Sequence, residues 1–488
     1  MTLAALLAFA TGHGFHRDEF YIRESGRHLA WGYPDHPPLS PLLARLADEL
    51  APDSLLVLRT PPALGAAMTV LLIGLIAREF GGTRPAQFLA ATVAAGSIIV
   101  LAGGHLLTTS SIDVVFATAL AFVLARMIRT GDVRLWPVAG VLLGLGLLNR
   151  VFLVVYAVVV VAAVAAVGPR TLLRTIWFPV GVVVASVIAA PTVVWQASNG
   201  WPEWEMATAI SADNSRWELL ALQGVIVGPL LLPLWLAGLW WLLRHPPVRC
   251  FGVAYLGLLA VLLVTSGATH YLFNAYPPLL AAAGISCAGW LTTGARALRT
   301  AALATLLAFS TALAAVSALP VLPVPVLAGT PIVAMNKEMG EQIGWPEMGR
   351  TVADVVNGLP AEVRARTVVL ADNYGQAGAI AHFGPDHATG GTAFPPVHSG
   401  HQAYGWWGPP PDHYTTAVML GTDAPSTIPH WAGRACGRIT EVATVRNDHG
   451  IANTENGTRV FLCEDLTATW SELWPHIRRV GPAPMPQN

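Results

Sequence analysis

Long apolar segments recur along the first two thirds of the chain. They lie at about 62–80, 86–104, 112–128, 135–149, 151–168, 175–195, 219–243, 251–267, 272–292 and 299–320. Several approach the roughly 20 residues that a helix needs to cross a bilayer. A shorter apolar segment at 1–15 is treated as a first span. The pattern predicts a mostly α, polytopic membrane protein of about 11 transmembrane helices.

Charged residues are scarce. They make up 12% of the 488 residues, against 54% hydrophobic residues, which is about half the charged share of a soluble domain. The net charge of -1 offers no basic field for a nucleic acid. We therefore exclude nucleic acid as a partner and expect membrane lipids instead.

Arginines occur in alternate loops between the apolar segments. Since Lys and Arg resist translocation, these loops are predicted to be cytoplasmic. The arginines are Arg78, Arg84, Arg126, Arg129, Arg134, Arg170, Arg174, Arg244, Arg249, Arg296 and Arg299. The loops 103–111 and 267–271 between them contain no Lys or Arg. This alternation predicts that the hydrophilic loop 16–61 and the C-terminal part lie outside the cytoplasm.

The composition changes near residue 329, which predicts a membrane domain at 1–328 and an extracytoplasmic α/β domain at 329–488. In the second domain we expect helices at 349–357 and after Gly375, and strands at 367–371, 416–420, 439–445 and 459–463. Cys436 and Cys463 lie in this polar part, whereas Cys250 and Cys287 lie in apolar stretches. Only the first pair is predicted to form a disulfide in an oxidising compartment.

The loop 16–61 carries the adjacent acids Asp18 and Glu19. Two surface helices are expected in it, at 18–31 and 39–50. One carboxylate, Asp18, could act as a general base while Glu19 holds a cation or a sugar hydroxyl. Acids are equally common at helix N-termini, so the spacing leaves both interpretations open. Tyr21, Asp35 and His36 are predicted to support this loop.

Further polar residues lie at the predicted outer rim. Asp113 stands at the entry of a span, where charged groups are rare and tend to be functional, although a helix cap is the alternative. Arg150 could pair with a lipid phosphate or extend to the interface. His270 and Tyr271 are predicted to join Arg150 at the phosphate, with interfacial anchoring as the alternative. Glu19 and Asp113 are also candidates for a divalent metal site; no nucleotide cofactor is expected.

Three other motifs carry weaker signals. Trp195-Gln196 and Asn199-Gly200-Trp201 suit sugar stacking or an interfacial belt. The run Asn373 to Gly378 weakly resembles a nucleotide loop but lacks its third glycine. The run His398 to His401 contains a conceivable Ser/His pair, yet residues this close in sequence rarely adopt triad geometry. Packing or acceptor contact is favoured there.

These residues together resemble a known group of enzymes. Asp18-Glu19 with Tyr21, the stretch Gly32 to Leu39, Asp113 and the run Gly144 to Leu148 are similar to glycosyltransferase families 39 and 83. These are the dolichyl-phosphate-mannose-protein mannosyltransferase-like and aminoarabinose-transferase-like enzymes of the C-type superfamily. The C-terminal runs at 340–346, 373–375 and 399–401 resemble bacterial, especially actinobacterial, members with a soluble tail.

The resemblance implies transfer of a sugar, with inversion, from a polyprenyl-phosphate donor to a glycan, lipid or protein acceptor outside the cytoplasm. It implies a base at Asp18, with mannose as the family-weighted sugar. Arg150 stands where the family usually has Lys. The main alternative function is a polytopic transporter or lipid flippase, but the charged residues collect at the outer rim and no internal repeat is visible. A non-catalytic scaffold would leave Asp18, Asp113 and Arg150 without a shared purpose.

Overall fold

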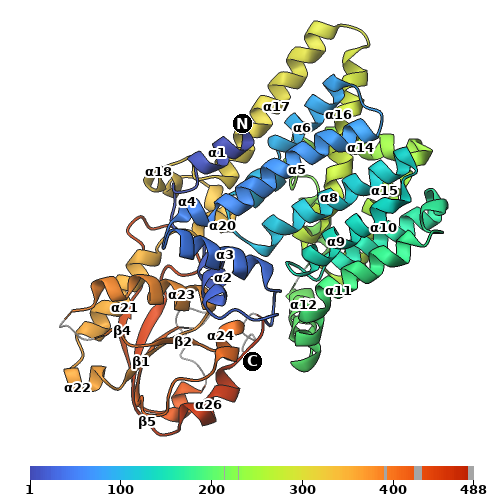
Figure 1. Cartoon of the computed structure of the whole chain (residues 1–488). Helices are drawn as coiled ribbons and strands as arrows, with labels where there is room; N and C mark the ends of the chain where they lie inside the picture. Colours follow the sequence, from blue (N-terminus) through green and yellow to red (C-terminus); the bar gives the residue numbers. More distant parts are fainter. Residues whose placement is uncertain (214, 229, 390–392, 422–430, 482–488) are drawn as a thin grey trace. The chain divides into compact units, whose positions relative to one another are not determined.

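The computed structural model describes residues 1–213, 215–228, 230–389, 393–421 and 431–481. The chain is mostly helical and divides into two compact units (Figure 1). The first, here the helical unit, contains residues 1–10, 29–201 and 210–321. The second, here the sheet unit, contains residues 11–28, 202–209 and 322–488. The first part of the loop 16–61 thus belongs to the sheet unit and the rest to the helical unit.

The helical unit is built from helices along its whole length. They are α1 (Thr2–Ala8), α3 (Leu39–Leu50), α4 (Leu55–Leu58), α5 (Thr60–Glu79), α6 (Arg84–Ala95), α7 (Ile98–His105), α8 (Thr109–Thr130), η1 (Val133–Leu135), α9 (Trp136–Leu147), α10 (Leu153–Val167), η2 (Arg170–Leu172), α11 (Trp177–Ser198), α13 (Arg216–Leu222), α14 (Leu232–Arg244), η3 (Pro246–Val248), α15 (Arg249–Thr265), η4 (Thr269–Ala275), α16 (Tyr276–Leu291) and α17 (Arg296–Ala318). A further helix, α12 (Pro202–Asp213), begins in the sheet unit and ends in the helical unit.

Five helical segments of the described chain are long and apolar enough to cross a membrane. They are Leu55–Glu79, Thr109–Thr130, Trp177–Ser198, Pro246–Thr265 and Arg296–Ala318. A sixth results if α6 and α7, which meet at a 55° bend, form one span. The chain is therefore a multi-pass membrane protein. The count of about 11 spans stays a prediction, because the segments at 133–147 and 153–167 are apolar but shorter.

The apolar segment at 86–104 is not one straight helix. α6 ends at Ala95, and the Ser97 side chain accepts a hydrogen bond from the Val100 backbone amide to begin α7. The Ser97 hydroxyl also donates to the Ala94 carbonyl at 2.7 Å. A serine that caps a new helix thereby satisfies backbone groups at the break.

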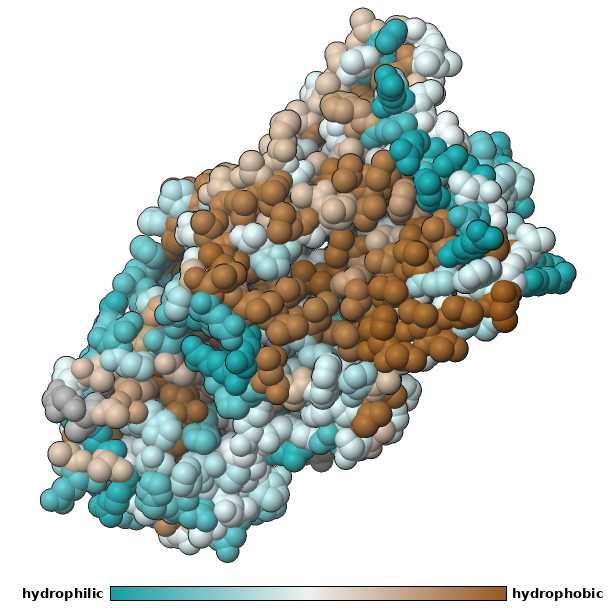
Figure 2. Space-filling model, in the orientation of Figure 1, coloured by the Kyte–Doolittle hydropathy of each residue, from teal (hydrophilic) through white to brown (hydrophobic). Residues whose placement is uncertain are grey.

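Small residues bring helices of this unit together. A Cβ added at Gly140 of α9 would lie 2.3 Å from the Gly181 carbonyl oxygen of α11, so only a glycine fits this crossing. Close approach through small residues is common between membrane helices. Figure 2 shows hydrophobic side chains gathered over the helices of this unit. On α5, Leu64, Met68 and Leu71 are exposed, as expected of a helix that faces lipid.

The sheet unit combines one sheet with short helices. Its elements are α2 (Arg17–Arg27), α18 (Val324–Ala328), α19 (Ile332–Met335), α20 (Lys337–Gly340), α21 (Trp345–Asn357), α22 (Ala361–Arg364), β1 (Thr367–Ala371), α23 (Tyr374–Phe383), η5 (Pro385–His387), β2 (Val397–Ser399), α24 (Ala403–Trp407), β3 (Thr416–Leu420), α25 (Ala432–Ala435), β4 (Cys436–Thr444), β5 (Arg459–Leu466) and α26 (Trp470–Ile477).

The five strands of the described residues lie in the order β2-β1-β3-β5-β4. β1 pairs in parallel with β2 and β3, in a register that places Val369 opposite both Val397 and Val418. β5 is antiparallel to β3 and β4. β1 and β3 are buried at every residue, as central parallel strands should be. Alternate residues of β1, β3 and β5 pack with Trp470, Leu473 and Trp474 of α26 in one core.

The strands predicted at 367–371 and 416–420 are confirmed to the residue as β1 and β3. β2 has only three residues and was not predicted, because so short a strand leaves no alternation to detect. Cys436 of β4 is disulfide-bonded to Cys463 of β5, with the Cα atoms 5.5 Å apart. Cys250 and Cys287 are free and buried.

Candidate active site

Arg150 lies in the turn between α9 and α10 of the helical unit. Its Nη2 donates to Nε2 of His270 at 2.8 Å, and its Nη1 donates to the Ser110 hydroxyl. Its guanidinium carbon lies 4.8 Å from the centre of the Tyr271 ring. The structure thus brings together Arg150, His270 and Tyr271, the three residues predicted to bind phosphate. We call these residues, with Ser110, the Arg150 cluster.

His270 belongs to η4, the short segment between α15 and α16. Burial, with the neighbouring Arg150 charge, lowers the pKa of His270 to about 3. A neutral imidazole can accept the hydrogen bond from Arg150 at Nε2 while it carries its own proton on Nδ1. The Arg150 cluster therefore carries one formal positive charge, which lies on the guanidinium, and so suits an anion.

Asp113 is the fifth residue of α8 and is 3% exposed. Its Oδ2 accepts from Nδ2 of Asn274 at 2.8 Å, while its Oδ1 has no hydrogen-bond partner among the described residues. The alternative interpretation of Asp113 as a helix cap is wrong, because Thr108 and Ser111 form the capping box of α8. A buried carboxylate oxygen without a partner is costly, so Asp113 is a strong candidate for ligand contact.

Asn149 was not singled out from the sequence, yet it joins three segments beside Arg150. Its Oδ1 accepts from the Ser40 hydroxyl and its Nδ2 donates to the Thr109 carbonyl, both at 2.7 Å. It is completely buried. The only sequence signal was one amide inside an apolar run. Asn149 therefore links the turn that contains Arg150 to the start of α3 and to the start of α8.

The predicted support residues Asp35 and His36 lie in a turn before α3. The Tyr33 amide donates to the His36 carbonyl at 2.9 Å, and Nδ1 of His36 lies 3.0 Å from Asp35 Oδ1. Gln196 of α11 donates to the Tyr33 carbonyl at 3.0 Å. Gln196 belongs to the motif Trp195-Gln196, for which sugar stacking and an interfacial belt were the two interpretations. Its side chain serves neither and instead anchors the backbone of the loop.

A small, mostly apolar cavity of about 30 Å³ adjoins Ser110 in the helical unit. It has room for about two water molecules. Its lining is Ala66, Thr69, Ile99, Val100, Gly103, Ser110, Ser111, Val114 and Phe273.

Asp18 and Glu19 lie in α2 of the sheet unit and have different surroundings. Glu19 is completely buried, and its Oε2 accepts from the His16 amide at 2.9 Å, which closes a capping box with His16. The helix-cap interpretation therefore applies to Glu19. Asp18 is 36% exposed at its side chain. Only Asp18 of the pair keeps the access that a general base needs.

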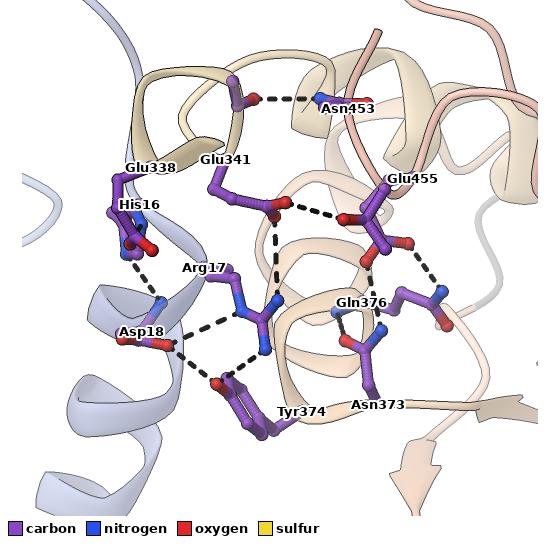
Figure 3. Close-up of polar contacts among 12 residues, drawn as sticks. His16, Arg17, Asp18, Glu338, Glu341, Asn373, Tyr374, Gln376, Asn453 and Glu455 are labelled. Carbon is purple, nitrogen blue, oxygen red and sulfur yellow. Dashed lines mark hydrogen bonds and ion pairs between the residues drawn. The ribbon is translucent and has the colours of Figure 1, made fainter. Parts of the chain in front are cut away.

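Tyr374, the first residue of α23, contacts Asp18 directly. Its hydroxyl donates to Asp18 Oδ1 at 2.8 Å and accepts from Nη2 of Arg17 at 2.9 Å (Figure 3). Nε of Arg17 also lies 3.6 Å from Asp18 Oδ1. We call Arg17, Asp18 and Tyr374 the Asp18 cluster. The contact joins residues 356 positions apart, so no local sequence pattern could have predicted it.

Tyr21, predicted to support the loop, stacks on Tyr374 with ring centres 4.6 Å apart. Its hydroxyl accepts from the Ala403 amide at 3.1 Å.

The glycines of the run Asn373 to Gly378 serve helix packing. A Cβ at Gly378 would lie 2.5 Å from the Cβ of Phe20 in α2. The resemblance of this run to a nucleotide loop has its physical reason there, in the close approach of α2 to α23.

Ser399 and His401 do not form a nucleophile pair. The Ser399 hydroxyl donates to the Asp372 carbonyl at 3.3 Å and accepts from the His401 amide at 3.2 Å. The His401 ring instead stacks on Tyr374, with centres 5.1 Å apart. Within the described ranges, no group of three or more His, Cys, Asp or Glu side chains is arranged to hold a metal ion.

Residues 35–195 match the model of the family described as dolichyl-phosphate-mannose-protein mannosyltransferase. The matched range includes Asp35, Asp113 and Arg150. No curated protein matches the chain.

Solved structures with a similar fold include ArnT from Cupriavidus metallidurans bound to undecaprenyl phosphate. Its TM-score is 0.60 at 15% identity, over 94% of this chain and 96% of that chain. The apo state of the same protein gives a TM-score of 0.57 at 15% identity, with the same coverage of 94% and 96%. The arabinofuranosyltransferase AftD from Mycobacteria gives 0.50 at 13% identity, over 96% of this chain and 40% of that chain. The chain thus has the fold of ArnT, and its residues 35–195 are similar to the dolichyl-phosphate-mannose-protein mannosyltransferase family.

Proposed function

We propose that this protein transfers a sugar, mannose or a related one, from a polyprenyl-phosphate donor to an acceptor outside the cytoplasm, with inversion. The observation that carries the proposal is the Arg150 cluster beside Asp113, whose Oδ1 is buried without a hydrogen-bond partner in the described chain. Arg150 and Asp113 both lie in the range that the family model matches. The similar structure of ArnT holds undecaprenyl phosphate, a ligand of the class that the Arg150 guanidinium suits.

The Arg150 cluster would hold the phosphate of the donor. A guanidinium presents parallel N–H donors that match phosphate oxygens. Ser110 and His270 fix the orientation of the Arg150 side chain before the donor binds. Binding therefore costs little side-chain conformational entropy. When the bond between the anomeric carbon and the phosphate oxygen breaks, the electron pair stays on that oxygen. The Arg150 charge stabilises the growing negative charge.

Asp18 would act as the general base. In the proposed step, the acceptor hydroxyl gives its proton to the Asp18 carboxylate as its oxygen attacks the anomeric carbon from the side opposite the phosphate. One C–O bond forms while the other breaks, and the configuration inverts. The divalent cation considered for Glu19 and Asp113 stays a prediction, and no step of the proposal passes through it.

The two ends of α8 support an outer location of the Arg150 cluster. α8 has 22 residues and extends about 33 Å. Ser110 lies in its first turn and Arg129 in its last turn. At the Arg129 end, Arg78, Arg126 and Arg129 gather around the fully buried carboxylate of Glu79. Basic loops stay cytoplasmic. The opposite end of α8, with the Arg150 cluster, would then face outward, as would the C-terminal domain at 329–488.

The test uses the purified full chain in liposomes with radiolabelled polyprenyl-phosphate mannose and membrane acceptors. We expect the label to enter acceptors with wild type and to stay in the donor with Asp18→Asn. Normal transfer by Asp18→Asn would remove Asp18 as the base. If wild type leaves the donor chemically intact while the labelled lipid crosses the bilayer, the protein is a flippase and the proposed function is wrong.

A further inference from the structure

Tyr374 contacts the proposed base from a distant part of the chain. Arg17 has only donor groups, so the Tyr374 oxygen must accept from it. The single phenolic proton is therefore left for Asp18 Oδ1, which lies 2.8 Å away. The direction of the relay, from Arg17 through Tyr374 to Asp18, follows from the donor inventory alone.

Two other rings stack on the Tyr374 ring, and the Arg17 guanidinium carbon lies 5.1 Å from its centre. Tyr21 stacks on it at 4.6 Å with 26° between the planes, and His401 at 5.1 Å with 21°. Paired stacking of this kind fixes the plane of the ring, and hence the line along which its hydroxyl points. The Tyr374 hydroxyl is in turn hydrogen-bonded to Arg17 and to Asp18.

The backbone of Tyr374 is fixed as well. The preceding Asn373 caps α23, since its Oδ1 accepts from the Gln376 amide at 3.0 Å. Asn373 Nδ2 in turn donates to the buried Glu455 carboxylate at 3.1 Å. On the other side, a Cβ at Gly375 would lie 3.0 Å from the Cβ of Arg17. The start of α23 and the start of α2 are therefore in close contact at the Asp18 cluster.

We propose that Tyr374 is a positioning residue for Asp18. The Tyr374 hydroxyl holds the Asp18 carboxylate oxygen Oδ1 in place and favours the charged form of the carboxylate. The inference rests on the proposed function only in making Asp18 the base. Burial raises the pKa of Tyr374 well above its ordinary value, so the phenol keeps the proton that it donates. The C-terminal part of the chain would thus supply part of the catalytic geometry and not only acceptor contacts.

The first experiment reads Asp18 without any turnover. The full chain in detergent is treated with a carbodiimide and glycine ethyl ester, which amidate protonated carboxyls, and the Asp18 peptide is quantified by mass against that of Glu49. Tyr374→Phe keeps the ring and removes the hydroxyl. Tyr404→Phe is the matched control, because the Tyr404 hydroxyl is buried but has no hydrogen-bond partner in the described chain.

We expect the pH midpoint of Asp18 amidation to move upward by about one pH unit in Tyr374→Phe, which corresponds to one lost hydrogen bond to a charged group. Tyr404→Phe should match wild type. The charged or titratable neighbours of the Asp18 cluster, namely His16, Arg17, Glu338, Glu341 and His401, are unchanged in both variants. Equal midpoints in the two variants would overturn the proposal. If Tyr374→Phe does not fold, Tyr374→Leu, which also lacks the hydroxyl and leaves Arg17 in place, replaces it and should move the midpoint the same way.

The second experiment separates this proposal from the proposed function. In the transfer assay, Tyr374→Phe should lower kcat about tenfold with little change in the KM for the donor, and should move the acid limb of the pH profile upward with the amidation midpoint. A moved amidation midpoint with unchanged kcat would mean that Tyr374 positions Asp18 but that Asp18 is not the base. An unmoved midpoint in an active enzyme would leave the proposed function standing and remove Tyr374 from it.

Discussion

Nη2 of Arg150 lies 2.8 Å from Nε2 of His270, a residue 120 positions further along the chain. The contact fixes a guanidinium in a turn between two short helices, where the side chain would otherwise have many rotamers. The contact therefore fixes the position of the positive charge. It is the feature of the helical unit that most directly suggests a bound anion.

Replacement of Arg150 by Met keeps much of the side-chain volume and removes the charge. We expect the affinity for undecaprenyl phosphate in detergent, measured by calorimetry, to fall about 10- to 100-fold, as for the loss of a charged hydrogen bond. The affinity of Arg150→Lys should lie between that of wild type and that of Arg150→Met, because an ammonium keeps the charge but lacks the planar pair of donors. Arg216→Met, at an exposed arginine bonded to Ser266, is the control. Equal affinities of Arg150→Met and Arg216→Met would contradict the phosphate role.

Glu455 should make the stability of the sheet unit depend on pH. Burial raises its pKa to about 7, against the lowering effect of hydrogen bonds from Gln376 and Asn373. The folded state therefore holds the proton more tightly than the unfolded state. This contribution is complete below the unfolded pKa of 4.5 and is lost as the pH rises through about 7.

The measurable consequence is a changing difference between wild type and Glu455→Gln. The free energy of opening at the α23 amides is obtained from hydrogen exchange at pH 5 and at pH 8. We expect the difference to shift in favour of Glu455→Gln by about 2–3 kcal/mol at the higher pH. Any constant cost of the amide cancels in this comparison. Two curves that stay parallel across this pH range would show that Glu455 titrates normally.

Gly378 is expected to be intolerant of a methyl group. A Cβ there would lie 2.5 Å from the Cβ of Phe20. Because a Cβ atom cannot move without its backbone, α2 and α23 would have to separate. Gly378→Ala should destabilise the sheet unit by about 1–3 kcal/mol. Gly433→Ala is the control, because nothing lies within 4 Å of a Cβ added at Gly433. Hydrogen exchange in α2 and α23 reads both variants; protection in Gly378→Ala equal to that in the control would refute the close contact.

Local patterns predicted the local structure well. α3 begins and ends at Leu39 and Leu50 as expected, and β1 and β3 have their predicted bounds. Alternation and apolar runs suffice for such elements because their burial repeats with the period of the backbone. Breaks such as Ser97 were missed, since a hydropathy window averages over one polar residue.

The sites were predicted only as far as their residue types allow. Arg150, His270 and Tyr271 were expected near one another because each lies at the same predicted rim, and they meet in the structure. Tyr374 was not expected at Asp18, because a contact over 356 positions leaves no trace in composition or spacing. The base at Asp18 was expected from the resemblance and stays a prediction, but the capping role of Glu19 depends on where its side chain points, which spacing does not record.

The disulfide between Cys436 and Cys463 provides a further test. In denaturant without reductant, both should resist alkylation, while the free Cys250 and Cys287 react and serve as internal positive controls. Labelling of all four under these conditions would rule the bond out. Denaturant is needed because Cys463 is completely buried, so a native thiol would also escape the reagent.

The same bond should stabilise the antiparallel edge of the sheet. It closes a loop between residues separated by 27 positions, for which loop-closure entropy predicts about 3–4 kcal/mol. The double replacement by Ser should therefore lower the free energy of opening of β4 and β5, read by hydrogen exchange, by up to that amount. β1 and α23 should lose less, because β3 separates β1 from β5. If protection in β4 and β5 is unchanged in the serine variant, strand pairing and not the bond holds this edge.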